Sequence, residues 1–250
     1  MTMTIRVNKA MIMAAGEGTR LRPLTNKVPK ALVPVGELPM IEHILIWLRH
    51  HGISEVAVNL CHLGDKIRGF LGNGSHLGVT ICYSDEKHLL GTAGGAKKME
   101  NFLDTTFTIV YGDILTDFNL SKMIQFHQKR GAIATIALMK VTVPEGVGIV
   151  EMDEERRIIN FIEKPTGDVP ASDYGNSGIY VLDKTIFNHI SEDSFSDFAY
   201  DVFPKLIELG LPFYGYVLAP EDYLIDIGTV EKFHTANRDV KAGKMKIKYG

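Results

Sequence analysis

The sequence predicts an α/β protein in which a mainly parallel sheet is flanked by helices and carries an inserted β-rich portion. Three observations lead to this fold class. In the first half, apolar runs of strand length alternate with amphipathic stretches of helix length. From Gly131 the pattern changes to strands separated by short turns, and after residue 197 the chain returns to helix and strand. The 250 residues, of which 45% are apolar, are enough to build a sizeable core.

The first half contains four expected strands and four expected helices in alternation. The strands cover residues 9–14, 55–60, 79–83 and 107–111. The helices cover residues 40–51, 65–71, 92–102 and 120–130. In the first helix, Ile41, Ile44 and Leu48 recur at helical spacing, and Gly52 follows its end. Because strand, helix and strand in succession form a βαβ unit, this order predicts parallel strands with helices on both faces.

The second half is expected to be richer in strands. The β-rich insertion contains strands over residues 132–141, 148–152, 158–163 and 177–182. It is followed by a helix over 198–209, a strand over 213–218, a short strand that ends at Asp226 and a closing helix over 229–242. No stretch rich in Pro, Gly or Ser cuts off an independent domain, and no internal repeat indicates an appended β-helix.

Composition and charge argue against several classes of protein. Lys and Arg number 27 and Asp and Glu number 30, so the formal net charge of −3 does not suit a basic nucleic-acid-binding protein. No apolar run approaches the roughly 20 residues that a membrane-spanning helix needs. The two cysteines, Cys61 and Cys82, form no CxxC pair, which argues against a disulfide scaffold or a cysteine zinc site and favours the reducing cytoplasm.

A turn of small residues follows the first expected strand directly. It contains Ala14, Ala15, Gly16, Gly18 and Thr19. Backbone N–H groups in such a turn can approach an anion closely, so the turn is a candidate phosphate cradle. A tight strand-to-helix turn without any ligand has the same local pattern.

The neighbouring residues distinguish this turn from the two commonest nucleotide motifs. A dinucleotide fingerprint has a third glycine where Leu21 stands, and the GK[ST] of a P-loop is missing. Instead, Arg20 and Arg22 follow the turn, and Lys30 comes ten residues after Arg20. Several cations around one loop suit a polyphosphate, whereas each of them alone would be an ordinary surface group.

The run from Met11 to Thr25, followed by the residues Pro-Lys-Ala-Leu-Val-Pro-Val at 29–35, resembles the signature of the nucleotide-sugar pyrophosphorylases, the sugar-1-phosphate nucleotidylyltransferases. Five further segments extend the resemblance over almost the whole chain, and residues 197–204 are similar to the mannose-1-phosphate guanylyltransferase branch. The resemblance implies a Rossmann-like core into which sugar-binding strands are built. It also implies that Arg20 and Lys30 are catalytic residues that bind the nucleotide phosphates.

One catalytic domain over residues 1–250 is expected from this resemblance. Its nucleotide-binding part covers about residues 9–130, its sugar-binding part about residues 131–228, and its C-terminal helix residues 229–242. The stretch after Thr229 has room for one helix and a basic tail, so no acyltransferase or β-helix extension is expected.

The segment from Ser84 to Gly95 resembles the base-binding segment of the family. A carboxylate at Glu86 can accept hydrogen bonds from guanine N1–H and the 2-amino group, and it would disfavour adenine, whose N1 is an acceptor. The resemblance places backbone and hydroxyl groups of Gly91 and Thr92 near the base and ribose. By itself, Glu86 also fits an exposed loop acid.

Two aspartates at strand ends are the metal candidates. Asp113 follows the strand over 107–111, at the carboxyl edge where open α/β sheets bind ligands. Asp226 ends another short strand, and only the resemblance pairs the two as ligands of one Mg²⁺, with Asp113 also at the nucleotide. Mg²⁺ usually takes one or two carboxylates, with water and phosphate as its other ligands. Either aspartate alone also fits a cap of the next turn.

Three later segments resemble the sugar-binding part of the family. The resemblance implies that Gly148 lets a hydroxylated ring lie against the backbone. It implies that Glu163 and Asn176 hold sugar hydroxyls. Lys164 would bind the sugar phosphate and take part in catalysis. As a residue pattern, the Glu-Lys-Pro run at 163–165 also fits a surface ion pair before a turn.

The implied reaction is attack by a sugar-1-phosphate oxygen on the α-phosphorus of a nucleoside triphosphate, with release of pyrophosphate. Because the nucleophile is already an anion, positioning and charge neutralisation replace a general base. The expected substrates are GTP and mannose 1-phosphate, or a related manno-configured sugar such as a heptose. A uridylyl- or thymidylyltransferase acting on another sugar 1-phosphate is the first alternative. A non-catalytic regulatory subunit that binds nucleotide sugars is the second.

The same resemblance sets the expected partners. These are the nucleoside triphosphate and the sugar 1-phosphate, with no nucleic acid and no membrane. A homo-oligomer, as a dimer or tetramer, is expected from the family alone.

Overall fold

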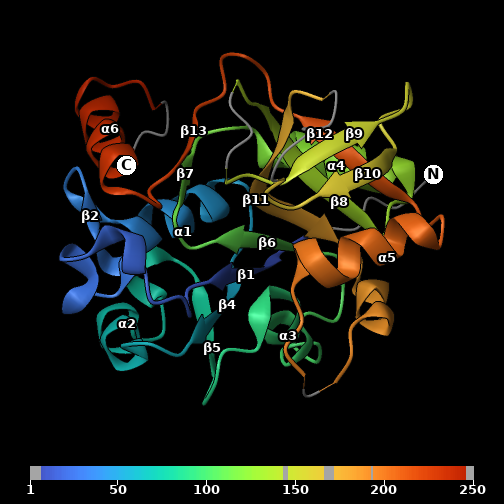
Figure 1. The fold of residues 1–250 in the computed structure, drawn as a ribbon. Helices are drawn as coiled ribbons and strands as arrows, with labels where there is room; N and C mark the ends of the chain where they lie inside the picture. Colours follow the sequence, from blue (N-terminus) through green and yellow to red (C-terminus); the bar gives the residue numbers. More distant parts are fainter. Residues whose placement is uncertain (1–6, 143–145, 166–171, 193, 246–250) are drawn as a thin grey trace. The chain divides into compact units, whose positions relative to one another are not determined.

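The computed structural model describes residues 7–142, 146–165, 172–192 and 194–245, and their packing divides the chain into two units (Figure 1). The parallel-sheet unit contains Asn8–Leu89, Val110–Asn119 and the chain from Glu221 onward. The antiparallel-sheet unit contains Leu90–Ile109 and Leu120–Pro220. The chain passes from the second of these to the first within β6 (Phe107–Tyr111).

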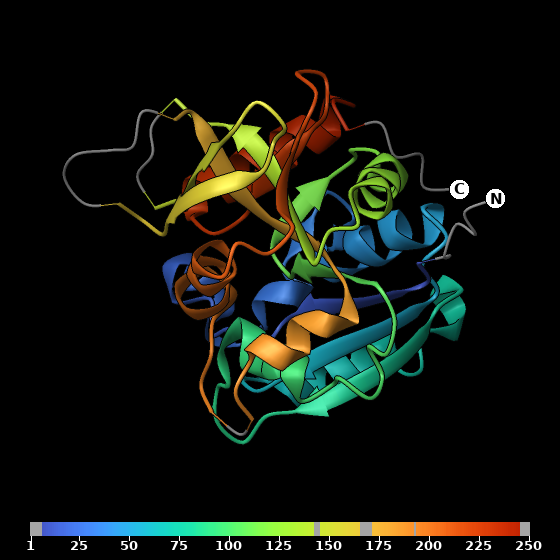
Figure 2. The same ribbon diagram turned by 90° about the vertical axis from the view of Figure 1, so that its right-hand side faces the viewer.

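Three parallel strands form the centre of the parallel-sheet unit: β1 (Lys9–Met13), β4 (Glu55–Leu60) and β5 (Thr80–Asp85). They run side by side from dark blue to teal in Figure 2, with Ala10 opposite Val56 and Val56 opposite Ile81. Their residues are largely apolar because strands of a parallel sheet are covered on both faces. α2 (Gly64–Leu71) packs on β4 and β5.

In the helix α1 (Met40–His50), the apolar residues that recur at helical spacing are buried, as the sequence predicts. Ile41, Ile44 and Leu48 are fully or almost fully buried, as their spacing predicts. Trp47 lies on the same face, and its indole N–H donates to the carbonyl oxygen of Phe118 at 3.0 Å. Gly52, with a φ of +82°, follows the end of the helix.

Short elements complete the parallel-sheet unit. β2 (Pro34–Val35) and β3 (Leu38–Pro39) form a small hairpin. β7 (Ile114–Thr116) pairs antiparallel with β13 (Leu224–Asp226), so two segments far apart in the sequence become neighbours. α6 (Val230–Lys241) follows β13 and packs on β13 and β2.

Among the described residues, five strands lie wholly within the antiparallel-sheet unit. In spatial order these are β10 (Ile158–Ile162), β9 (Ile149–Met152), β11 (Tyr174–Leu182), β8 (Ala134–Lys140) and β12 (Phe213–Val217). All neighbours are antiparallel except β12, which runs parallel to β8. The helix α4 (Leu120–Arg130) packs on β8, β11 and β12. The buried ring of Phe203 lies 5.0–5.4 Å from the rings of Phe161, Tyr180 and Phe213, which places the core at this point.

The predicted α/β fold class is confirmed, while one expected helix is shorter than predicted and another is only partly α-helical. α3 (Gly91–Lys97) ends five residues before residue 102, where N–H groups bond three residues back, as from Met99 to Ala96. The expected helix over 198–209 is a π-helical turn (Phe198–Val202) followed by α5 (Phe203–Glu208). Pro204 has no N–H to donate to residue 200, so a regular α-helix cannot continue through it.

The expectation of one catalytic domain stays a prediction. Within the described part of the chain, no helix has both the length and the apolar character needed to cross a membrane.

Candidate active site

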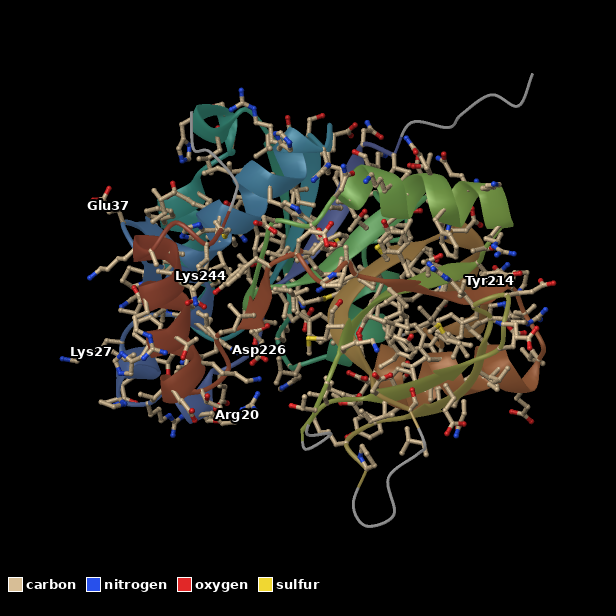
Figure 3. All side chains as sticks on the ribbon, turned by 90° about the horizontal axis from the view of Figure 1, so that it is seen from above. Arg20, Lys27, Glu37, Tyr214, Asp226 and Lys244 are labelled. Carbon is tan, nitrogen blue, oxygen red and sulfur yellow. The ribbon has the colours of Figure 1, made fainter. Side chains whose placement is uncertain are left out.

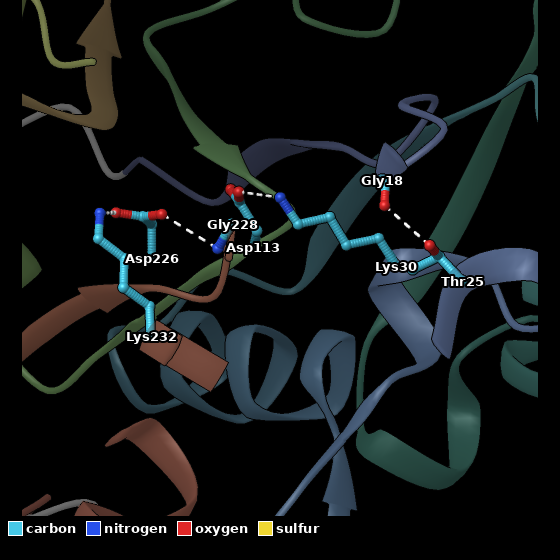
Figure 4. A network of polar contacts seen from close by, with 7 residues as sticks. All are labelled: Gly18, Thr25, Lys30, Asp113, Asp226, Gly228 and Lys232. Carbon is cyan, nitrogen blue, oxygen red and sulfur yellow. Dashed lines mark hydrogen bonds and ion pairs between the residues drawn. The ribbon is translucent and has the colours of Figure 1, made fainter. Parts of the chain in front are cut away.

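The turn after β1 depends on Gly18 for its shape. Gly18 has a φ of +64°, in the left-handed region that favours glycine. Its carbonyl oxygen accepts hydrogen bonds from the Thr25 hydroxyl at 2.8 Å and from the Leu21 N–H at 3.0 Å. A Cβ atom at this position would come within 3.0 Å of the Lys30 Cβ. Gly18 therefore lets the turn pack closely on Lys30 (Figure 4).

The other predicted residues of the turn divide into a buried start and an exposed part. Ala14 and Ala15 are buried, whereas Gly16 and Thr19 are exposed. A Cβ atom on Gly16 would meet no heavy atom within 4 Å, so the backbone here borders open space. The turn thus offers its backbone to solvent where the sequence predicts phosphates.

Glu86 is connected to the start of the turn through Asn59. The side-chain amide of Asn59 donates to Glu86 Oε1 at 2.8 Å, and its carbonyl oxygen accepts from the Ala14 N–H at 2.7 Å. Glu86 is only 6% exposed, so it is not the exposed loop acid that the residue pattern alone also allows. Asn59 orients one oxygen of the candidate base-reading carboxylate and fixes it relative to the glycine turn.

The backbones of Asp113 and Asp226 are neighbours. Asp226 lies opposite Ile114 in the β7–β13 pair, and the Ile227 N–H donates to the Asp113 carbonyl oxygen at 2.9 Å. The N–H of Gly112 donates to the carbonyl oxygen of Met13 at the end of β1. These bonds place both aspartates beside the strand that leads into the glycine turn.

Each of the two aspartates forms an ion pair with a lysine (Figure 4). Lys30 pairs with Asp113, and both side chains are less than one-fifth exposed. Lys232, in the first turn of α6, pairs with Asp226. Lysine ammonium groups therefore neutralise both carboxylates.

The donor set at Asp113 and Asp226 fits Mg²⁺ and does not fit a structural zinc ion. Two carboxylates are oxygen donors, and Mg²⁺ commonly takes one or two of them and completes its shell with water and phosphate. A structural zinc site needs four protein ligands. Among the residues that the structure describes, no cluster of three or more His, Cys, Asp or Glu side chains could hold a metal ion.

The Arg20 side chain extends from the glycine turn to Gly228, beside Asp226. A Cβ atom on Gly228 would lie 2.7 Å from Asp226 Oδ1 and 3.2 Å from Arg20 Nη2, so both side chains lie against Gly228. The Gly228 N–H donates to Asp226 Oδ1 at 3.0 Å. Figure 3 shows Arg20 and Asp226 beside α6. Arg22 pairs instead with Glu17 at 3.6 Å on the surface.

In the antiparallel-sheet unit, all four predicted sugar-binding residues lie next to one another. A Cβ atom on Gly148 would come within 2.5 Å of Glu163 Oε2, and the Gly148 carbonyl oxygen accepts from the Asn176 N–H at 2.8 Å. Lys164 has a φ of +45°, and its ammonium group lies 3.4 Å from Glu163 Oε1. Burial raises the pKa of Glu163, and the Lys164 charge opposes this rise.

A bulge in β11 sets the direction of the Asn176 side chain. The β11–β8 register shifts between Asn176 and Tyr180, next to Gly178 with its φ of +77°. The Asn176 amide donates to the Tyr180 hydroxyl at 3.0 Å, and its oxygen accepts from the Gly178 N–H at 3.0 Å. The side chain is thus held in one orientation.

Gly91 and Thr92 contact the segment around Ser196. Gly91 has a φ of +76°, and a Cβ atom there would come within 2.3 Å of the Ser196 carbonyl oxygen. The Thr92 hydroxyl donates to Asp197 at 2.9 Å and accepts from the Phe198 N–H. A structural role explains both residues, and their expected contacts with base and ribose stay a prediction.

Asn59 and Lys232 are absent from the residues predicted from sequence. Asn59 has a detectable signal, because it is the one polar residue in the Val-Ala-Val-Asn-Leu part of β4. Lys232 has a weaker one, since a lysine six residues after Asp226 looks like an ordinary helix-surface group.

Two known relatives of this chain, and the family model that it matches, are named as nucleotidyltransferases. A family model described as nucleotidyl transferase matches residues 9–243. The chain is 37% identical over 254 residues to a UTP–glucose-1-phosphate uridylyltransferase of Synechocystis sp., a match that covers 95% of this chain and 64% of that protein. It is 35% identical over 236 residues to a mannose-1-phosphate guanylyltransferase of Mycobacterium tuberculosis, covering 94% of this chain and 65% of that protein. The chain therefore spans slightly less than two thirds of both relatives.

A solved structure from Bacillus anthracis, provisionally named a glucose-1-phosphate thymidylyltransferase in complex with sucrose, has a similar fold. Its TM-score to this chain is 0.84 at 27% sequence identity, and the match covers 97% of each chain.

Proposed function

Because this chain belongs to the nucleotidyl transferase family, we propose that it transfers a nucleotidyl group from a nucleoside triphosphate to a sugar 1-phosphate. An oxygen of the sugar phosphate forms a bond to the α-phosphorus, and the bond from that phosphorus to the pyrophosphate oxygen breaks. The products are a nucleoside diphosphate sugar and pyrophosphate. One observation carries the proposal: Asp113 and Asp226 lie on paired backbone segments, beside the Arg20 that ends the glycine turn.

The residues of the parallel-sheet unit would bind the triphosphate. The exposed backbone at Gly16 and the cations Arg20 and Lys30 suit phosphate oxygens. Asp113 and Asp226 would hold Mg²⁺. When bound, Mg²⁺ would reduce the negative charge on the phosphate that is attacked. Holding the α-phosphate in line for attack is then the main contribution of the protein.

The residues of the antiparallel-sheet unit would bind the sugar phosphate. Gly148 has no side chain, which lets the Glu163 carboxylate lie against its backbone at the place where a sugar hydroxyl would bind. Glu163 and Asn176 would bind sugar hydroxyls. The Lys164 side chain is 55% exposed and can reach a phosphate group in solution, which supports its role as the cation for the attacking phosphate.

We propose GTP as the nucleotide because of Glu86. A carboxylate accepts only, and guanine presents two neighbouring donors, N1–H and the 2-amino group. Uracil presents one donor, N3–H, between two carbonyl acceptors that would face the carboxylate unfavourably. Mannose 1-phosphate or a related manno-configured sugar, such as a heptose, is the proposed acceptor, and the Mycobacterium tuberculosis relative supports it.

UTP with glucose 1-phosphate is the second candidate. It is favoured by the Synechocystis sp. relative, whose identity of 37% exceeds that of the guanylyltransferase at 35%. In that case Glu86 would need a different partner, such as a ribose hydroxyl. A thymidylyltransferase and a non-catalytic nucleotide-sugar-binding subunit are further outcomes of the test.

The deciding experiment measures pyrophosphate release with Mg²⁺ for GTP, UTP, dTTP and ATP against mannose, glucose and heptose 1-phosphates. We expect GTP with a manno-configured sugar to react fastest. A clear preference for UTP or dTTP would overturn the guanylyl assignment and leave the transferase assignment intact. No release with any pair, together with binding of a nucleotide sugar, would identify a non-catalytic subunit.

A cytoplasmic location and a homo-oligomer accompany this proposal. Both cysteines, Cys61 and Cys82, are free thiols, which supports a reducing compartment. Size-exclusion chromatography with light scattering would measure the oligomeric state.

A further inference from the structure

Among the residues that the structure describes, Lys232 is a cation at the candidate metal site that the sequence motifs do not include. We propose that it pairs with Asp226 before substrate arrives and then moves to bind the phosphate oxygens of the leaving pyrophosphate. The proposal rests on the proposed transferase function. It makes Lys232 a substrate-binding residue and not a surface ion pair.

The position of Lys232 is fixed by the start of α6. Thr229 is the N-cap of this helix, and its hydroxyl accepts from the Lys232 N–H at 3.3 Å. The Lys232 backbone is therefore held within the first helical turn, while its ammonium group pairs with Asp226 Oδ2 (Figure 4). The four-carbon side chain can change its partner without a change in the backbone.

Exposure distinguishes Lys232 from Lys30. The Lys30 side chain is 17% exposed and lies against Gly18, whereas that of Lys232 is 44% exposed. Lys232 consequently has more room to turn from Asp226 toward a ligand that arrives from solvent.

The charges of the site also favour an exchange of partners. Arg20, Lys30 and Lys232 carry three positive charges, and Asp113 and Asp226 carry two negative charges. A divalent cation between the aspartates would compete with both lysines for the same oxygens. A lysine displaced in this way would be next to a triphosphate, whose charge gives it a new partner.

A purely structural role for the Lys232–Asp226 pair is less consistent with the packing of α6. The helix has other attachments in its second half. Asn237 Oδ1 accepts from the Gly36 N–H at 2.9 Å, and the mostly buried Asp239 accepts from the Tyr223 hydroxyl at 3.2 Å and pairs with Lys244 at 2.6 Å. α6 is thus attached to the rest of its unit without Lys232.

Three variants of the full chain test the proposal: Lys232→Ala, Lys232→Arg and, as matched control, Lys241→Ala in the exposed last turn of the same helix. The first measurement is Mn²⁺ binding without nucleotide, from the electron paramagnetic resonance signal of the free ion. We expect Lys232→Ala to bind Mn²⁺ several-fold more tightly than wild type, because a competitor for Asp226 is lost.

The second measurement is the binding of inorganic pyrophosphate with Mg²⁺ by calorimetry, with the KM for pyrophosphate in the reverse reaction beside it. Lys232→Ala should weaken binding about tenfold or more, since a charge-assisted contact is lost. Lys232→Arg should retain most of the affinity, and Lys241→Ala should equal wild type in both measurements.

The outcomes separate this inference from the proposed function. Unchanged pyrophosphate affinity in Lys232→Ala overturns the inference, and so does unchanged or weaker Mn²⁺ binding. If wild type shows no Mg²⁺-dependent reverse reaction with any nucleotide sugar, the proposed function fails. The two binding measurements then still decide the role of Lys232.

Discussion

The backbone N–H of Ile227 donates a 2.9 Å hydrogen bond to the carbonyl oxygen of Asp113. Because Ile227 directly follows Asp226, this bond keeps two aspartates adjacent that are more than 100 residues apart in the sequence. Next to this bond, the three residues of β7 pair with the three residues of β13. The proposed two-carboxylate metal site would therefore depend on backbone pairing and not on flexible side chains alone.

Asp113→Asn and Asp226→Asn should each lower turnover by about 10² or more, because each removes a charged oxygen ligand from the metal site. Pyrophosphate release at saturating substrates measures this effect, and circular dichroism checks that the fold is retained. Asp65→Asn, at the exposed start of α2, is the matched control and should equal wild type. Near-normal turnover in either site variant would remove that aspartate from the metal site.

Lys164→Ala should also lower turnover by about 10² or more, because it removes the proposed cation for the attacking phosphate. The fold should be unaffected, since the Lys164–Glu163 ion pair is more than half exposed on the lysine side. Steady-state kinetics with the sugar 1-phosphate varied test this prediction. Lys184→Ala, an exposed lysine of the same unit, should leave both kcat and KM unchanged.

Glu86→Gln should change the choice of base. A glutamine oxygen can still accept from Asn59, so the fold is kept, but the amide nitrogen is a donor that matches a uracil carbonyl better than guanine N1–H. We expect kcat/KM with GTP to fall about tenfold or more relative to UTP. Asp85→Asn, the exposed neighbouring acid that pairs with Arg68, is the control. An unchanged GTP to UTP ratio would show that Glu86 does not read the base.

Gly228→Ala should damage the metal site without unfolding the protein. The added Cβ would come within 2.7 Å of Asp226 Oδ1 and 3.2 Å of Arg20 Nη2, so one of these side chains must move. We expect weaker Mn²⁺ binding and a higher KM for the triphosphate. Gly69→Ala in α2, where a Cβ meets nothing within 4 Å, should leave activity unchanged and be neutral or stabilising by up to about 1 kcal/mol. Wild-type Mn²⁺ affinity in Gly228→Ala would contradict this reading of the site.

The stability of the protein should fall on acidification because of the buried His127 and the half-buried His51. Burial lowers the pKa of His127 to about 4, with an opposing effect from Asp183, and burial together with the His50 charge lowers that of His51 to about 4. Both imidazoles are neutral in the folded state and become protonated first in the unfolded chain. Their contribution to the free energy of unfolding is therefore present above pH 6.5. As the pH falls from 6.5 toward 4, each histidine lowers this free energy by about 1.4 kcal/mol per pH unit.

Urea unfolding at several pH values between 4.5 and 7.5 measures this loss. His127→Gln should reduce the slope of the unfolding free energy against pH by about one proton relative to wild type. His76→Gln, an exposed histidine, should leave the slope unchanged. A wild-type slope in His127→Gln would show that His127 is not the titrating group.

The parts of this protein that were predictable from sequence are those with a local physical signal. Apolar runs and helical spacing located β1, β4 and α1, because burial of one face or both faces repeats along the chain. The glycine turn was recognisable since its small residues and following arginine are contiguous. Where a local rule competes with the periodicity, the geometry of an element differs from the prediction. The expected helix over 198–209 changes from π-helical to α-helical geometry at Phe203, next to Pro204, whose missing N–H the spacing of apolar residues does not report.

The contacts that complete the site depend on strand pairing and helix packing. Asn59 joins Ala14 to Glu86 only because β4 lies beside both β1 and β5. Lys232 meets Asp226, six residues earlier in the sequence, because α6 begins four residues after the end of β13 and packs on it. The sequence alone determined the fold class, the glycine turn and the residue types proposed to bind anions, since these follow from local spacing and chemistry. Only the tertiary structure decided which carboxylate each cation meets, because these partners depend on strand register and helix packing.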